Sequence, residues 1–226
     1  VAPAEINGRL THEKKVEEDY IAITVGGGVG RDGIHGATAS SKELSAEDDI
    51  DDLGQTVQIG DPIEEKKVLD VMKILRDAGL IEASQDCGAG GWNSAVGELA
   101  ELCNGAVMDL TNAPIKYKGL MSWEKLVSEA QERVVLVIKP ENYDKVMEIC
   151  NHYKVNADKI ANFNKTGYYE VKDQDKTAVF LPMKFRTQGL PEMTIKAHWT
   201  PPEEKIINII STEDLKDALL NLIGTP

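Results

Sequence analysis

Residues 26–41 constrain this chain most, because six of these sixteen residues are glycines. They follow residues 20–25, an apolar run that predicts a buried strand. Glycine costs backbone entropy, so this density indicates positive φ angles or a ligand that lies against the main chain. The stretch also contains an arginine and several hydroxyl groups, and bare N–H groups beside an arginine suit a phosphate. We therefore predict a phosphate-binding loop at a strand end, with a long structural turn as the alternative.

Residues 28–33 match the dinucleotide-binding pattern G-x-G-x-x-G. That pattern requires a helix to open at its third glycine. Here residues 34–41 contain another glycine and show little helical periodicity, and no Lys-Ser or Lys-Thr pair completes a P-loop. The sequence therefore argues against a nicotinamide or flavin site.

The composition narrows the class of partner. The 226 residues carry a formal net charge of −13 and show no basic stripe, which argues against a nucleic-acid partner. A small phosphorylated ligand needs only a few local donors and is compatible with this charge. No apolar run approaches the roughly 18 residues of a membrane span. The three widely spaced cysteines form neither a disulfide framework nor a zinc pattern, which predicts a cytoplasmic protein.

A helix is predicted over residues 61–79. Asp61 suits its N-cap, Pro62 suits the first helical position, and a glycine ends the pattern. Gln58 lies just before this well-specified helix start, where its amide can be held in a fixed place.

A second glycine-rich loop, residues 85–91, lies between a predicted strand at 80–84 and a predicted helix at 92–103. Asp86 is a carboxylate at the end of that strand, and it suits a hard cation that carries phosphate oxygens. A turn or capping role is the alternative. Cys87 has no histidine beside it in sequence, so we expect a small buried side chain and not a nucleophile.

Residues 134–138 are five consecutive apolar side chains, which predicts a central strand covered on both faces. Glu129 and Gln131 lie where the chain leads into this strand. Polar side chains near the core of a sheet need partners, either from the protein or from a ligand.

The other expected elements follow from local turn and cap signals. They are a helix over 123–128 capped by Ser122, a helix over 140–152, a β-hairpin of strands 160–163 and 168–171, a turn at 173–176 into a strand at 177–181, irregular chain from 182 to 205, and a helix over 212–223 capped by Ser211.

Four glycine-rich or polar blocks occur in a fixed order. They are Gly-Arg-Asp-Gly-Ile-His-Gly-Ala-Thr-Ala-Ser-Ser at 30–41, Val-Gln-Ile-Gly-Asp-Pro at 57–62, Gln-Asp-Cys-Gly-Ala-Gly-Gly at 85–91, and Ser-Glu-Ala-Gln-Glu-Arg at 128–133. Together they resemble the phosphoribosylformylglycinamidine synthases, the ATP-dependent amidotransferases of de novo purine synthesis. The resemblance covers about residues 20–185 and corresponds to the C-terminal half of that family's first aminoimidazole-ribonucleotide-synthetase-like repeat.

The resemblance implies an α+β fold, a three-layer α/β/α arrangement with a mixed sheet, of the C-terminal domain type of aminoimidazole ribonucleotide synthetase. This domain is expected over residues 19–185. Residues 1–18 are expected to lead in from a missing N-terminal domain. Residues 186–226 are expected to connect to a missing second half and to end in a helix.

The resemblance also implies a chemistry. The family uses ATP to phosphorylate the amide oxygen of formylglycinamide ribonucleotide, and ammonia from a glutaminase domain or subunit then displaces phosphate to give the amidine. The implied substrate contacts are Gln58, Glu129, Ala130 and Gln131, with Arg31, Asp32 and His35 lining the same site and Asp86 binding Mg²⁺. Ala130 stands where the family usually has serine, so a main-chain contact is expected there.

No catalytic residue is expected in this part of the family pattern, because the catalytic histidine and most ATP contacts belong to the missing domain. The isolated chain is therefore expected to be inactive. Two alternatives remain open. One is another ATP-dependent enzyme of the same domain type, such as aminoimidazole ribonucleotide synthetase or selenophosphate synthetase, and the other is an inactive binding module.

Overall fold

The computed structural model describes residues 5–6, 9–10, 13–41, 59–191, 193–201 and 215–224. The chain divides into two compact units, Val1–Leu190 and Pro191–Pro226. The first unit holds the sheets and the helices that cover them, and the second holds helix α8 (Leu215–Ile223). No helix in the described part of the chain is long and apolar enough to cross a membrane.

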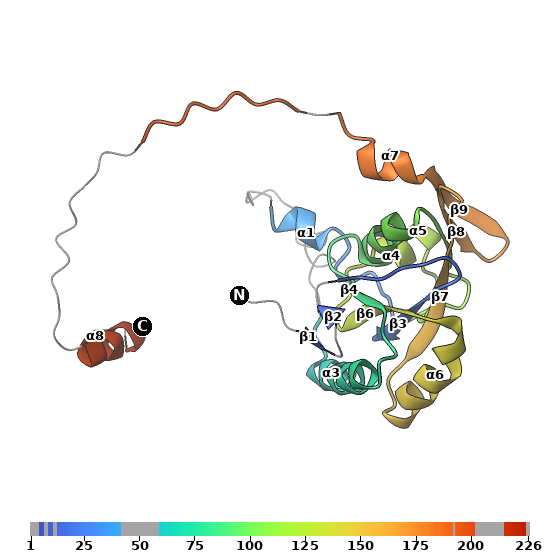
Figure 1. The fold of residues 1–226 in the computed structure, drawn as a ribbon, viewed down its shortest axis with the longest axis horizontal. Coiled ribbons are helices and arrows are strands. Elements are labelled where there is room, and N and C mark those ends of the chain that lie inside the picture. The colour runs from blue at the N-terminus through green and yellow to red at the C-terminus, as the bar shows by residue number, and fades with distance from the viewer. Residues whose placement is uncertain are drawn as a thin grey trace. The chain divides into compact units, whose positions relative to one another are not determined.

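Among the described residues, a seven-stranded sheet runs through the first unit in the order β4-β6-β3-β7-β5-β8-β9 (Figure 1). Its strands are β3 (Ile21–Gly26), β4 (Ala83–Asp86), β5 (Ala106–Asp109), β6 (Arg133–Ile138), β7 (Ala157–Phe163), β8 (Tyr168–Asp173) and β9 (Lys176–Pro182). The pairing of β5 with β8 is parallel and the other pairings are antiparallel, so the sheet is mixed. A separate short pair consists of β1 (Glu5–Ile6) and β2 (Arg9–Leu10).

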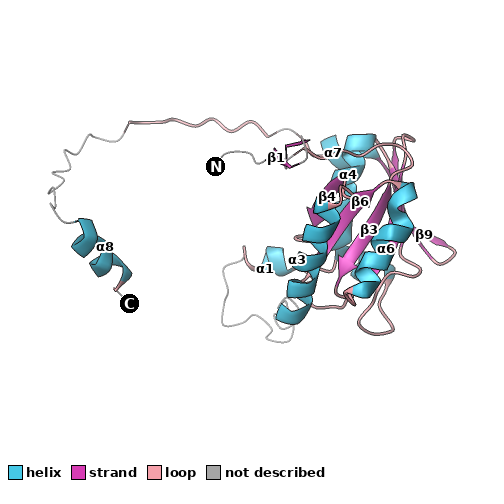
Figure 2. Ribbon diagram, turned by 60° about the horizontal axis from the view of Figure 1, so that its bottom comes forward, coloured by secondary structure: helices cyan, strands magenta, loops and turns pink. Residues whose placement is uncertain are grey.

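Helices cover both faces of the large sheet (Figure 2). Helices α3 (Pro62–Asp77) and α6 (Tyr143–His152) pack on one face, and α4 (Gly91–Cys103) and α5 (Ser122–Val127) pack on the other. Val135 and Val137 of β6 join the core under α4, whereas Leu136 and Ile138 join the core under α3 and α6. This alternation explains why the strand is apolar at every position from 134 to 138, and the predicted α+β fold in three layers is confirmed.

The start of α3 follows from its sequence. Asp61 has an extended backbone, and its Oδ1 accepts hydrogen bonds from the N–H groups of Ile63 and Glu64, both at 3.1 Å. Pro62 is the first helical residue and has no N–H to leave unpaired. The predicted cap is therefore confirmed.

The predicted hairpin of residues 160–171 is wrong, because β5 lies between β7 and β8. Ala106 of β5 is opposite Phe163 on one side and Tyr169 on the other. The turn between β7 and β8 instead binds the α4–β5 connection, where the Gly167 N–H donates to Asn104 O at 2.8 Å. The turn residues carry a local signal only, so they cannot show that a distant strand inserts between the two arms.

Three other elements differ from the expectations. Met121 is the residue before α5, and Ser122 is its first helical residue, whose hydroxyl donates to Asp173 Oδ2 at 2.8 Å. The strand expected at 80–84 begins later, at Ala83. The chain after 182 forms helix α7 (Met183–Gln188), whereas the sequence, with several prolines further along, predicted irregular chain there.

Two expected helices are described differently from the prediction. The helix expected at 140–152 begins as a 3₁₀ turn, η1 (Pro140–Asn142), before α6. The last expected helix is described as α8, and its expected cap Ser211 lies outside the described residues.

Candidate functional site

The first glycine loop, residues 26–41, begins at the end of β3 and lies against the α5–β6 connector, residues 128–132. Gly26 has a φ of +111°, and a Cβ there would lie 2.0 Å from Glu132 O. The N–H of Gly27 donates to the same carbonyl at 3.0 Å. Glycine is therefore required at position 26, because a side chain would force the loop away from the connector. The loop also contains the short helix α1 (Gly36–Ala39), which begins after the third glycine of the dinucleotide pattern.

The second glycine loop, residues 85–91, approaches the same connector from the end of β4. Gly90 and Gly91 have φ values of +78° and +53° and lead directly into α4. A Cβ at Gly91 would lie 2.1 Å from Ser128 O. Both glycine loops are therefore packed against one short segment, although more than 40 residues separate them in sequence.

Glu129 joins the two loops through its carboxylate. It is buried, with 5% of its surface exposed. Its Oε2 accepts from the N–H of Ala37 at 3.1 Å, and its Oε1 accepts from the N–H of Gly90 at 3.3 Å. The hydroxyl of Ser128 adds a third link by donating to Asp32 O at 3.3 Å.

Arg133, the first residue of β6, holds the connector through hydrogen bonds to its backbone. Its guanidinium is buried and donates from Nε to Ala130 O at 2.8 Å and from Nη2 to Ser128 O. The guanidinium lies 5.1 Å from the ring centre of Trp92, whose indole N–H donates to Thr24 Oγ1 at 3.0 Å. Burial lowers the pKa of Arg133 from its ordinary value. The buried guanidinium thus binds two carbonyl groups of the connector.

Arg31 and Asp32 tie the first glycine loop to the chain before and within α5. Arg31 Nε donates to Glu124 Oε1 at 2.6 Å, and its Nη2 donates to Gly119 O at 3.0 Å. The hydrogen bond to Arg31 lowers the pKa of the Glu124 carboxyl. Asp32 Oδ2 forms an ion pair with Lys116 at 2.7 Å. These side chains therefore have protein partners, and the prediction that they line a ligand site stays a prediction.

The remaining predicted contacts occupy different environments. His35 is exposed, has a φ of +63° and immediately precedes α1. Ala130 is buried and Gln131 is exposed, so the connector turns from the core toward the surface between them. Gln58 lies outside the described residues. The ligand roles of all four residues stay predictions.

Asp86 is the last residue of β4 and is exposed. It pairs in register with Val134, next to the connector, and its Oδ1 accepts a 3.3 Å hydrogen bond from Gln85 Nε2. Across the described residues, no three His, Cys, Asp or Glu side chains gather to hold a metal ion. Mg²⁺ commonly takes one or two carboxylates together with water and phosphate oxygens, so a single exposed carboxylate fits that mode of binding.

Sequence reasoning missed the roles of several residues within the connector block. Glu132 Oε1 accepts from the N–H of Asp61 at 2.9 Å, which ties the start of α3 to the connector. Arg133 binds the carbonyls of Ser128 and Ala130, the two neighbours of Glu129 in sequence. One signal was available, because a charged residue directly before an all-apolar strand must find buried partners.

Cys87 is a buried thiol beside the second glycine loop, and burial raises its pKa from 9.0 to about 11. Between pH 9 and 11 the unfolded chain therefore loses this proton while the folded chain keeps it. The stability that this thiol contributes is complete below pH 9 and is lost as the pH rises through 11.

We expect the difference in unfolding free energy between the wild type and Cys87→Ala to fall by about 1 kcal/mol from pH 8 to pH 10. Urea unfolding at both pH values measures it. A difference that stays constant would show that the thiol is not shielded from water.

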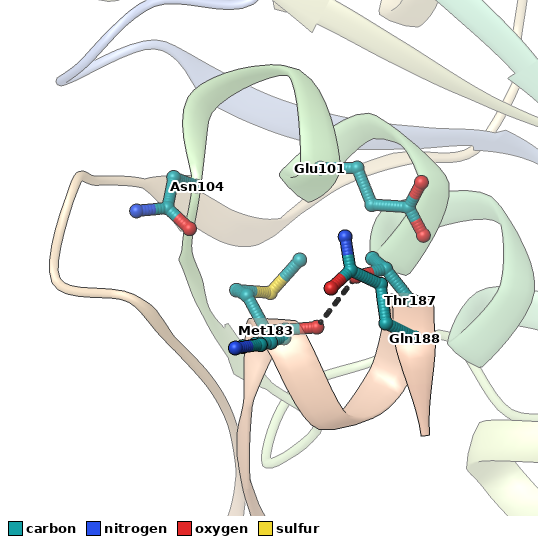
Figure 3. Close-up of a pocket in the computed structure, with 6 residues that line it drawn as sticks. Glu101, Asn104, Met183, Thr187 and Gln188 are labelled. Carbon is teal, nitrogen blue, oxygen red and sulfur yellow. Dashed lines mark hydrogen bonds between the residues drawn. The ribbon is translucent and has the colours of Figure 1, made fainter. Parts of the chain in front are cut away.

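A pocket of about 240 Å³ lies between the end of α4 and α7 (Figure 3). Its lining residues are Glu101, Asn104, Met183, Lys184, Thr187 and Gln188. The glycine loops meet the connector at the opposite end of α4, so this pocket is separate from the candidate site.

Comparison with known proteins identifies relatives of this arrangement. The family model described as AIR synthase related protein, C-terminal domain, matches residues 19–174. The chain is 32% identical over 211 residues to a phosphoribosylformylglycinamidine synthase subunit PurL from Methanopyrus kandleri, covering 88% of this chain and 29% of that protein. It is 37% identical over 163 residues to the subunit of the same name from Petrotoga mobilis, covering 71% of this chain and 22% of that protein. The chain thus spans less than a third of the length of these two relatives.

Solved structures agree with the sequence matches. The structure described as Thermotoga maritima PurL complexed with FGAR matches with a TM-score of 0.78 and 30% identity, covering 88% of this chain and 32% of that one. The same protein complexed with ATP matches with a TM-score of 0.71 and 28% identity, covering 87% of this chain and 30% of that one.

Proposed function

The chain belongs to the family of AIR synthase related proteins, C-terminal domain, and from this premise we propose that it is the substrate- and Mg²⁺-binding part of a phosphoribosylformylglycinamidine synthase. One observation carries the proposal: two glycine loops from distant parts of the sequence meet at the α5–β6 connector. A relative of the same fold has been solved with FGAR, and the same relative has been solved with ATP.

In the proposed reaction, ATP transfers its γ-phosphoryl group to the amide oxygen of formylglycinamide ribonucleotide. Ammonia then adds to the activated carbon, phosphate leaves, and the amidine remains. The role of this chain is binding and orientation. The connector presents its main chain at Glu129, Ala130 and Gln131, and Gln58 contributes an amide.

Asp86 is proposed to hold Mg²⁺, which neutralises charge on phosphate oxygens when it is bound. Its place beside the connector supports this role, because a cation there lies close to the proposed substrate contacts. The exposed carboxylate is also accessible to a phosphorylated ligand.

The proposed partners follow from the length of the relatives, of which this chain covers less than a third, and from the family resemblance of the sequence blocks. The chain is proposed to work with the remaining domains of a longer protein, which bind most of the ATP, and with a glutaminase that supplies ammonia in the cytoplasm. Residues 1–18 and 186–226 are proposed to be the connections to those domains, and the isolated chain is proposed to be inactive.

Calorimetry with formylglycinamide ribonucleotide and Mg²⁺ tests the proposal, using the chain alone and the chain extended by the segments that its longer relatives carry. We expect Gln58→Ala to weaken binding about tenfold, because one amide hydrogen bond is lost. We expect Asp86→Asn to weaken binding only when Mg²⁺ is present.

Gln188→Ala is the matched control, because it removes an exposed amide on α7. This variant should bind like the wild type. If the extended wild-type protein binds no ribonucleotide, the substrate role is wrong, and the chain is better described as an assembly module of the same fold.

A further inference from the structure

Glu129 poses a physical question because it is a carboxylate in a buried position, with 5% of its surface exposed. A buried charge is tolerated only when hydrogen bonds or opposite charges replace the lost water. Two of its donors are backbone N–H groups, one from each glycine loop.

The two oxygens of this carboxylate serve different loops. Oε2 accepts from the N–H of Ala37 in the first glycine loop at 3.1 Å. Oε1 accepts from the N–H of Gly90 in the second glycine loop at 3.3 Å. This one side chain therefore links the two loops. Hydrogen bonds to an ionised acceptor are stronger than those between neutral groups, which strengthens both contacts.

The base of this bridge is itself held in place. Arg133 binds the carbonyls of Ser128 and Ala130, on either side of Glu129 in the sequence. The backbone of Gly91 packs against Ser128 O so closely that no Cβ fits between them. The carboxylate therefore projects from a fixed backbone, and its position determines where both loops can lie.

We propose that Glu129 is a positioning residue for the proposed ribonucleotide site: its carboxylate sets the spacing of the two glycine loops. The bridging geometry stands by itself, whereas the consequence for ligand binding rests on the proposed function. If the Glu129 carboxylate faced the ribonucleotide, its negative charge would repel the ligand's phosphate. In this structure the carboxylate accepts hydrogen bonds from the N–H groups of the two loops.

Glutamine at position 129 has the same shape but only one acceptor oxygen, so its NH₂ group must face one of the two N–H donors. We expect Glu129→Gln to raise the hydrogen-exchange rate of the Ala37 or Gly90 amide at least tenfold. Amide exchange measured by NMR on the 226-residue chain reports both sites. Amides of Val71 in α3 and Leu136 in β6 report whether the core has changed.

Glu132→Gln is the matched control. Its carboxylate lies in the same connector, but the hydrogen bond to Asp61 uses Oε1 alone, so a glutamine oxygen can replace it. This variant should leave the exchange of the Ala37 and Gly90 amides within twofold of the wild type. Wild-type exchange at both amides in Glu129→Gln would overturn the proposal.

A second variant keeps the test available if Glu129→Gln does not fold. Ala37→Pro removes the first-loop donor, in the first turn of α1 where proline is tolerated, and leaves the carboxylate intact. We expect the Gly90 amide to stay protected while the affinity for formylglycinamide ribonucleotide falls about tenfold, measured by calorimetry on the extended protein. Unchanged affinity in a folded variant would overturn the link between loop spacing and binding.

The two proposals fail in different ways. If the wild type binds no ribonucleotide but Glu129→Gln releases a loop amide, the positioning role stands and the proposed function falls. If the wild type binds the ribonucleotide and Glu129→Gln changes neither amide nor affinity, the proposed function stands and the positioning role falls.

Discussion

Replacing Arg133 with methionine is expected to lower the free energy of unfolding by about 3 kcal/mol. Methionine keeps an unbranched apolar stem, but it is shorter than arginine, donates no hydrogen bond and removes the charged guanidinium that lies over the Trp92 ring. The carbonyls of Ser128 and Ala130 then lose charged donors in a buried place, at about 1–3 kcal/mol each. Relief from burying the charge, which the lowered pKa of Arg133 indicates, offsets part of this loss. Urea unfolding measures the difference.

Arg186→Met is the matched control for Arg133→Met. Arg186 also lies over an aromatic ring, that of Tyr169, but it donates to one backbone carbonyl, Asn93 O, at 3.1 Å, and the side chain of its ion-pair partner Glu101 is 41% exposed. We expect this substitution to cost about 1 kcal/mol, because it removes one part-buried carbonyl contact and an ion pair whose carboxylate reaches water. If the two variants lose equal stability, the hydrogen bonds from Arg133 to the two buried carbonyls do not contribute more to the unfolding free energy than the contacts of Arg186.

Gly91→Ala is expected to destabilise the fold by about 3–4 kcal/mol and to separate α4 from the connector. The residue has a φ of +53°, where an L-residue costs about 1–2 kcal/mol. The added Cβ would lie 2.1 Å from Ser128 O, a backbone atom that cannot rotate away, and such overpacking costs about 1–3 kcal/mol more. Thermal or urea unfolding measures the loss.

Gly79→Ala separates the two causes. Gly79 has a φ of +68°, and an added Cβ would meet nothing within 4 Å. The substitution should therefore cost only the conformational part, about 1 kcal/mol. Equal losses at positions 79 and 91 would mean that backbone strain alone, and not contact with the connector, requires glycine at 91.

The elements that the sequence predicts correctly are those whose cause lies within a few residues. Asp61 and Pro62 define the start of α3 because a cap acts over three residues. The strand β6 is predicted because burial on both faces leaves only apolar residues at positions 134–138. Local chemistry was sufficient in both places.

The failures arise where a distant segment decides the structure. The turn after β7 has ordinary hairpin residues, but β5 occupies the place that β8 would take. Ser122 has the composition of a cap, but its hydroxyl is drawn to Asp173, which also pairs with the buried Lys125. Residues close in sequence predict neither the insertion of β5 nor the contact with Asp173.

The candidate site shows the same division. The sequence blocks indicated that the glycine loops and residues 129–131 belong to one site, and the structure brings these segments together. The sequence could not show that Arg31 is bound to Glu124, or that the Glu129 carboxylate faces two N–H groups. The hydrogen-bond partners of Arg31 and Glu129 depend on which loops lie side by side, and the order and register of the strands determine this.

The position of β3 has a consequence for how the chain is made. This strand is the earliest of the large sheet in the sequence, yet both of its neighbours, β6 and β7, come more than 100 residues later. A ribosome adds about 5–20 residues per second, so the apolar strand waits several seconds for either edge to be covered. The first strand of this sheet to be synthesised is thus among the last to be enclosed.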